Sequence, residues 1–213
     1  MTVASLTPAE KRIVLRNVSW KTFERLIEEL GEDRKTRLAY SEGFLEIMTP
    51  LGEHENNNRF IESLIGAIAD ELNLNMKRFG SLTLKRESMQ QGAEPDSCYY
   101  FVNEPMVREK QKIDLNFDPP PDLVLEIDIT SSSLNKQLIY AAIGVPEIWR
   151  YDGRGLEFFV LQEPILIYNK VQQSSIFPGL SFDVIPRFMR QSLIDGETAT
   201  LRAFRVWVRE QNW

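Results

Sequence analysis

The sequence predicts an α/β fold, in which a central mixed β-sheet is flanked by α-helices. The first observation is an alternating apolar strand at 122–130, followed by a helix at about 132–143 and a second strand at 147–152. A helix between two strands of one sheet implies a crossover, which makes the two strands parallel. The second observation is helical periodicity elsewhere in the chain. It places flanking helices at about 19–31, 53–73 and 197–211.

Composition limits the class of protein. With 213 residues, of which 43% are hydrophobic, the chain can bury a proper core, and we expect one domain over residues 1–213. The net charge of −6 means that any contact with nucleic acid must come from a local patch. The single cysteine, Cys98, excludes an internal disulfide framework and fits a reducing compartment. Because no secretory signal or membrane-spanning run is found, we expect a cytoplasmic protein.

The elements of the first third follow from local signals. Residues 1–18 carry a weak mixed pattern and are expected to form a loose arm. Ser19 is a suitable N-cap for the first helix, and Gly31 follows its end. Two short apolar stretches within 37–48 predict a β-hairpin. The helix at 53–73 has an apolar stripe at helical spacing, made by Ile61, Leu64, Ile65, Ile68 and Leu72.

The rest of the chain reads mainly as strands around one crossover helix. Further strands are expected at 76–80, 81–87, 97–103, 156–162 and 164–171. The crossover helix ends at Gly144-Val145-Pro146, since glycine and proline stop a helix. An amphipathic helix at about 197–211 closes the chain.

Two acids interrupt the apolar strand at 122–130. Glu126 and Asp128 share one face of this strand. One interpretation is an edge strand with one hydrated face. The crossover argues instead for an interior strand covered on both faces, where two carboxylates about 7 Å apart would repel and lose hydration. A divalent cation between them would offset both costs, since Mg²⁺ and Mn²⁺ prefer carboxylate oxygens.

Asp96 and Lys136 complete the predicted metal centre. Asp96 follows a proline at the start of a strand, although a turn-forming aspartate is the simpler interpretation of this dipeptide alone. Lys136 lies near the start of the crossover helix, where the helix dipole disfavours a cation, so neighbouring carboxylates explain it better. Asp96, Glu126 and Asp128 as ligands of Mg²⁺ or Mn²⁺, with Lys136 beside them, suit phosphodiester hydrolysis.

These residues resemble a known family. The segments "EPDS" and "PPDLVLEIDITSSSLNKQLIYAAIGVPEIWRYDG", with "GFLEIMTPLGEHE" and "FGSLTLKRE", resemble the Uma-type endonucleases of the PD-(D/E)XK restriction-endonuclease-like superfamily. The resemblance covers about residues 38–155. It implies a restriction-endonuclease-like fold, with Asp96 as the first acid of the motif and Glu126 as the second. The superfamily pattern expects lysine two residues after Glu126, where this chain has Asp128, so Lys136 looks like a relocated lysine.

Three further side chains are candidates for auxiliary roles. His54, the only histidine, opens the helix at 53–73 and would otherwise be solvated or capping. Glu46, in the hairpin strand, is either an auxiliary acid or part of an exposed strand face. Tyr140 lies one turn after Lys136, so it borders the site or belongs to the edge of the core. Cys98 has no histidine partner nearby in the sequence and is interpreted as a packing residue.

A few cations are candidates for contact with a phosphate backbone. They are Lys85, Arg86, Arg202, Arg205 and Arg209. The last three form a basic stripe on the C-terminal helix, opposite Phe204 and Trp207. The alternative for all five is an ordinary solvated face.

The sequence therefore predicts a metal-dependent endonuclease that cleaves DNA, with Mg²⁺ or Mn²⁺ as cofactor. One alternative is a degenerate nuclease fold that binds DNA or a protein without cutting, which the acidic charge and the displaced lysine favour. Another is a metal-dependent hydrolase of a small phosphoester. A homodimer is a reasonable assembly, because enzymes that cut both strands commonly pair two sites.

Overall fold

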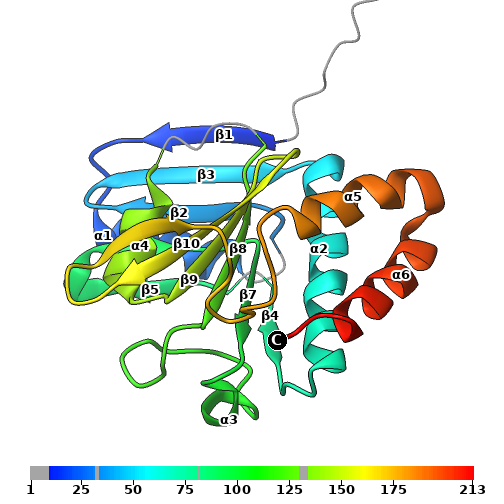
Figure 1. Ribbon diagram of the computed structural model, residues 1–213. Helices are drawn as coiled ribbons and strands as arrows, with labels where there is room; N and C mark the ends of the chain where they lie inside the picture. Colours follow the sequence, from blue (N-terminus) through cyan, green and yellow to red (C-terminus); the bar gives the residue numbers. More distant parts are fainter. Residues whose placement is uncertain (1–9, 32–33, 81, 130–133) are drawn as a thin grey trace, which may run out of the picture.

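The computed structural model describes residues 10–31, 34–80, 82–129 and 134–213 (Figure 1). Its strands form two sheets where a single central sheet was predicted, so the mixed α/β class is confirmed and the sheet count is corrected. The five-stranded sheet has the order β1 (Glu10–Leu15), β3 (Phe44–Pro50), β2 (Arg37–Ser41), β6 (Gln91–Ala93) and β5 (Leu84–Arg86). The six-stranded sheet has the order β11 (Ile167–Val171), β10 (Leu156–Gln162), β9 (Glu147–Tyr151), β8 (Leu123–Ile127), β7 (Ser97–Tyr100) and β4 (Lys77–Phe79).

The chain crosses between the sheets at Glu94-Pro95-Asp96. β6 ends at Ala93 in the five-stranded sheet, and β7 begins at Ser97 in the six-stranded sheet. A proline has no N–H to donate to a ladder, so Pro95 is suited to a break between two strands. Asp96 is therefore held at the junction of the two sheets, immediately before a strand, as the sequence predicts.

The predicted crossover is present in the six-stranded sheet. β8 and β9 pair in parallel, from Leu123 opposite Glu147 to Ile127 opposite Tyr151, and α4 (Lys136–Ile143) lies between them in the chain. All five residues of β8 are buried. The strand is therefore covered on both faces, and the interpretation as a half-hydrated edge strand is wrong.

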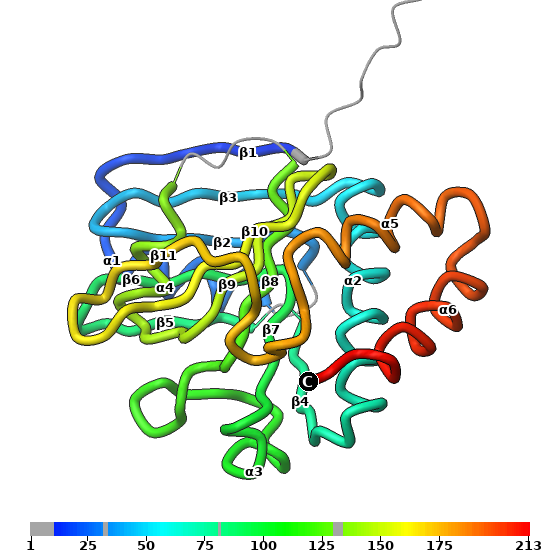
Figure 2. Tube along the Cα trace, viewed as in Figure 1, coloured from blue at the N-terminus to red at the C-terminus, as the bar shows by residue number. Residues whose placement is uncertain are grey.

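The layers of the fold are visible in Figure 1. Helix α1 (Trp20–Leu30) covers the outer face of the five-stranded sheet through Trp20 and Phe23, which pack on Leu38 and Leu45. Helix α4 lies between the two sheets, where Tyr140 shares a core with residues of both. The outer face of the six-stranded sheet is covered by α2 (Gly52–Glu71), α5 (Val184–Asp195) and α6 (Glu197–Arg209) (Figure 2).

Local signals account well for the first helix and the hairpin. The Ser19 hydroxyl accepts a hydrogen bond from the amide of Thr22 at 3.1 Å and so caps α1. Glu42 and Gly43, between β2 and β3, both have positive φ, 45° and 92°, as a tight two-residue hairpin turn requires. The helix predicted at 53–73 is α2.

Other expectations need correction. Residues 10–15 form β1, which pairs with β3, so this part of the predicted loose arm is an ordered strand. The crossover helix begins at Lys136 with Asn135 as its N-cap, later than the predicted start, while Ser131–Ser133 lie outside the described residues. β6, α5 and two short helices were not predicted, namely α3 (Glu104–Val107) and the 3₁₀ turn Glu87–Met89. None of the described helices combines the length and apolarity that a bilayer crossing requires.

Candidate active site

Glu126, on β8, is held by two side chains of α4. The Lys136 ammonium donates to Glu126 Oε2 at 2.6 Å, and the Tyr140 hydroxyl donates to Oε1. Helical side chains lean toward the helix N-terminus, which lets Lys136, the first residue of α4, reach back to the strand. The expectation that Lys136 has carboxylates as neighbours is confirmed, and Tyr140 directly borders the site.

The protonation preferences in this cluster follow from burial and charge. Burial raises the pKa of Glu126, and the negative charge of Asp96 adds to this, while Lys136 opposes it. Lost hydration thus raises the pKa of Glu126 more than repulsion between the acids does. Burial pushes the pKa of Lys136 down, but the two carboxylates outweigh it and the pKa rises. Burial and the Glu126 charge also raise the pKa of Tyr140, so its hydroxyl stays protonated.

Asp96 contributes a second buried carboxylate with one free oxygen. Its Oδ2 accepts a hydrogen bond from the amide of Ile127 at 2.8 Å and lies 3.2 Å from His54 Nε2. Burial raises the pKa of Asp96, but His54 and Lys136 more than compensate and lower it overall. Its Oδ1 is buried without a hydrogen-bond partner among the described residues. Such an oxygen is costly in a folded protein, and it is available to a ligand.

His54 and Glu46 are both buried, which decides between their alternative interpretations. His54 is 0% exposed, in the first turn of α2 beside Asp96, and the N-cap of this helix is Leu51, so His54 is neither solvated nor the capping residue. Glu46 is 1% exposed in β3, so the exposed-face interpretation is wrong. The sequence suggested both as auxiliary residues, and the structure places both near the predicted acids.

Asp128 is bound from the opposite sheet. Arg12, on β1, donates from Nη2 to Asp128 Oδ1 at 3.0 Å and from Nη1 to Glu46 Oε1 at 2.7 Å. The described residues contain no group of three or more His, Cys, Asp or Glu side chains that is arranged to hold a metal ion. The predicted grouping of Asp128 with Asp96 and Glu126 as three ligands is therefore not what the structure assembles.

Sequence reasoning missed Arg12 because it assigned residues 1–18 to a loose arm. A signal was present: Ile13-Val14-Leu15 is an apolar run with two β-branched residues, which favours a strand. What the local pattern could not provide was the partner strand, β3, which directs the Arg12 side chain toward Glu46 and Asp128.

Most of the predicted phosphate-contacting cations are engaged within the protein. Lys85 pairs with Glu24 at 2.7 Å, and Arg205 and Arg209 each pair with Glu71 at 2.9 Å. The stripe on α6 thus attaches this helix to α2. Arg86 is half-buried in β5, and Arg202 is exposed on α6.

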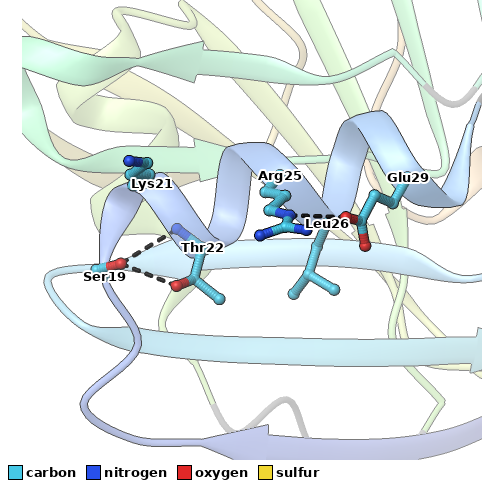
Figure 3. Close-up of a pocket in the computed structure, with 6 residues that line it drawn as sticks. All are labelled: Ser19, Lys21, Thr22, Arg25, Leu26 and Glu29. Atoms are coloured by element: carbon cyan, nitrogen blue, oxygen red, sulfur yellow. Dashed lines mark hydrogen bonds and ion pairs between the residues drawn. The ribbon is translucent and has the colours of Figure 1, made fainter.

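A surface hollow lies away from these acids, on α1. It has a volume of about 370 Å³ and follows the outer side of the helix (Figure 3). Its lining is Ser19, Lys21, Thr22, Arg25, Leu26 and Glu29. None of these residues belongs to the predicted site, so the candidate site is recognised by its buried polar cluster.

Comparison with known families agrees with this cluster. Residues 20–186 match a family described as "Putative restriction endonuclease", and this range contains Asp96, Glu126 and Lys136. The chain belongs to the Uma2 family. The resemblance found in the sequence is thereby confirmed. β1, which carries Arg12, lies outside the part of the chain that matches Uma2.

Solved structures support the Uma2 assignment at the level of the fold. The chain is similar to a structure described as "a putative nuclease belonging to DUF820" from Anabaena variabilis ATCC 29413. The TM-score is 0.51 at 17% sequence identity, and the alignment covers 75% of this Uma2 chain and 94% of the other. No curated protein matches the chain.

Proposed function

We propose that this Uma2 protein is a metal-dependent endonuclease that hydrolyses DNA phosphodiester bonds. The observation that carries the proposal is the contact of 2.6 Å between Lys136 Nζ and Glu126 Oε2, beside the buried, unpartnered oxygen of Asp96. Two carboxylates and one ammonium are the groups that metal-assisted phosphodiester hydrolysis uses. The family description supports the same class of reaction.

The residues present fit Mg²⁺ or Mn²⁺. Asp96 Oδ1 has no hydrogen-bond partner among the described residues, and each oxygen of Glu126 keeps a second lone pair beyond its one hydrogen bond. Hard divalent cations take such oxygen ligands. Asp96 and Glu126 would hold the ion, and two carboxylates against one ammonium leave a negative charge for it to neutralise. Asp128, bound to Arg12, is not needed as a ligand.

The protein groups then have separate roles. A divalent ion bound to Asp96 and Glu126 would polarise the phosphate and lower the pKa of a bound water. The Lys136 ammonium lies where it can stabilise negative charge that develops on the phosphate. Tyr140 fixes Glu126 by donating to Oε1, and the Ile127 amide fixes Asp96, so both carboxylates are oriented before substrate arrives.

A plasmid-nicking assay tests the proposal. Supercoiled DNA is incubated with the protein in Mg²⁺, in Mn²⁺ and in EDTA, beside Glu126→Gln and the exposed-site control Glu197→Gln. We expect nicking in either metal, none in EDTA, a loss of about 100-fold or more in Glu126→Gln, and no loss in the control. Absence of metal-dependent nicking by the wild type would overturn the proposal.

Two further assays separate the alternatives if the plasmid stays intact. The aspartate at the position where the superfamily pattern has lysine favours a binding module, which would shift DNA mobility without cutting it. A hydrolase of small phosphoesters would cleave a nitrophenyl phosphodiester and leave the plasmid intact. We further infer a homodimer for cutting both strands, which sedimentation equilibrium measures directly.

A further inference from the structure

Arg12 brings a buried carboxylate, Glu46, and a partly buried one, Asp128, from different sheets to one guanidinium. Glu46 comes from β3 of the five-stranded sheet, and Asp128 follows β8 of the six-stranded sheet. The Arg12 side chain is 11% exposed, and those of Glu46 and Asp128 are 1% and 16% exposed. All three charges are thus largely withdrawn from water.

The geometry of the guanidinium makes the two acids converge. Nη1 and Nη2 are neighbouring atoms of one planar group, and each binds a different carboxylate, at 2.7 Å and 3.0 Å. Two carboxylates that converge on one cationic group are ligands of the type that a divalent ion would take in its place. The charge of the guanidinium offsets the repulsion between the two acids and part of the cost of withdrawing them from water.

We propose that Arg12 is a built-in cation that excludes divalent metal from Glu46 and Asp128, and so confines metal to Asp96 and Glu126. The second half of this statement rests on the proposed function, whereas the first half does not. Arginine is always charged in proteins, so its blocking charge persists at every working pH. Arg12 is therefore a positioning residue that determines how many ions the centre accepts.

The inference also explains why Lys136 pairs with Glu126. Asp128 follows Glu126 by two residues and would attract the same ammonium. With Asp128 bound to Arg12, Lys136 donates to Glu126 at 2.6 Å. Arg12 thus separates the acids into two groups. Glu46 and Asp128 are neutralised by Arg12 within the protein, whereas Asp96 and Glu126 are left for the metal.

Counting bound Mn²⁺ on the full chain tests this role. Free Mn²⁺ is followed by electron paramagnetic resonance, and heat release by titration calorimetry. We expect Arg12→Gln to bind one more Mn²⁺ equivalent than the wild type. Arg12→Lys, which keeps the charge, and Arg12→Gln with Asp128→Asn, which removes one of the two acids, should both return to the wild-type number.

A matched control comes from another buried ion pair. Arg34, 10% exposed, pairs with Glu94, 2% exposed, and no second carboxylate is seen on it among the described residues. Arg34→Gln leaves a single buried acid, so it should gain no Mn²⁺. If Arg12→Gln is unfolded without metal, Mn²⁺ should refold it and should not refold the double variant, as circular dichroism would show.

The outcomes separate this inference from the proposed function. Equal Mn²⁺ numbers in the wild type and Arg12→Gln, or an extra equivalent that persists in the double variant, would overturn the role of Arg12. A wild type that binds no Mn²⁺ would overturn the metal site at Asp96 and Glu126, while the difference between wild type and Arg12→Gln still decides the role of Arg12.

Discussion

Lys136 Nζ lies 2.6 Å from Glu126 Oε2, so the acid of the buried strand β8 and the first residue of the following helix form one ion pair. The two residues are only 10 positions apart, and the N-terminal turn of α4 brings them together. Removing this lysine tests the proposed function, because a lysine that only balances charge would not affect the rate of cleavage.

The first prediction concerns that lysine. Lys136→Ala should lower plasmid cleavage by about 100-fold or more, because in the proposed mechanism the ammonium stabilises the phosphate in the transition state. Mn²⁺ affinity should change little, since lysine is not a ligand. Lys170→Ala, which removes a surface ion pair with Glu157, serves as the control. Normal cleavage by Lys136→Ala would exclude the relocated-lysine mechanism.

The second prediction concerns Tyr140. Tyr140→Phe leaves a buried oxygen of Glu126 without its donor, which should cost about 1–3 kcal/mol of unfolding free energy. Tyr100→Phe is the matched control, because its hydroxyl donates to a neutral acceptor, the Pro119 carbonyl. The control should lose about 0.5–1.5 kcal/mol in urea denaturation. A larger loss of unfolding free energy in Tyr100→Phe than in Tyr140→Phe would contradict the inference that buried Glu126 depends on the hydrogen bond from Tyr140.

The third prediction concerns Asp128. The sequence suggests that Asp128→Asn should leave stability unchanged or raise it, because two acids on one strand face repel. The ion pair with Arg12 reverses the expected sign. We expect a loss of about 1–3 kcal/mol, measured by urea denaturation, with Mn²⁺ affinity at Asp96 and Glu126 retained. An increase in stability would show that the repulsion dominates the ion pair.

The fourth prediction concerns Cys98. This thiol is 0% exposed, and burial raises its pKa well above the ordinary value. The reactive thiolate is therefore scarce at pH 8, and a reagent cannot reach it in the folded chain. Labelling with a disulfide reagent should be negligible in buffer and should reach one equivalent in guanidinium chloride. Rapid labelling of the folded protein would contradict the packing role.

The fifth prediction concerns the attachment of α6 to α2. The hydrogen bond from Arg205 lowers the pKa of Glu71, with help from Arg209. A lowered folded-state pKa gives stability that is present above the unfolded pKa and lost as pH falls through the folded one. Arg205→Gln should therefore lower Tm at pH 7 and have a smaller effect near pH 3. The exposed Arg202→Gln should change Tm at neither pH.

The parts of the fold that the sequence predicts well are those with local causes. The strand at β8, the helix α4 and the strand β9 follow from alternation, a glycine stop and the crossover rule, all within about thirty residues. The Glu126–Lys136 contact is predictable for the same reason, because a helix start faces the strand that precedes it. Asp96 is recognisable through its proline and the resemblance to the family.

The parts that the sequence does not predict depend on distant pairing. Two sheets replace one because β1, β2, β3, β5 and β6 pair among themselves, which no local pattern specifies. The alternation at 122–130 predicts Glu126 and Asp128 on one face, but β8 ends at Ile127, and the pattern cannot show that the two acids bind different cations. Arg12 is 116 residues from Asp128, so only the assembled sheets reveal their contact.

Pro95 lies at the crossing between the two sheets, and each sheet contributes residues to the candidate site. The two sheets must therefore join before this site is complete. The contacts that build the centre span 10 residues for Lys136, 31 for Asp96 and 116 for Arg12. Contacts between distant residues cost more loop-closure entropy and form later. During synthesis, the ion pair between Lys136 and Glu126 would form early, and the other contacts of the site would form only when both sheets have joined. Under the proposed function, an unfinished or misfolded copy would lack a complete centre for cutting DNA, and the DNA of the cell that makes it would be protected.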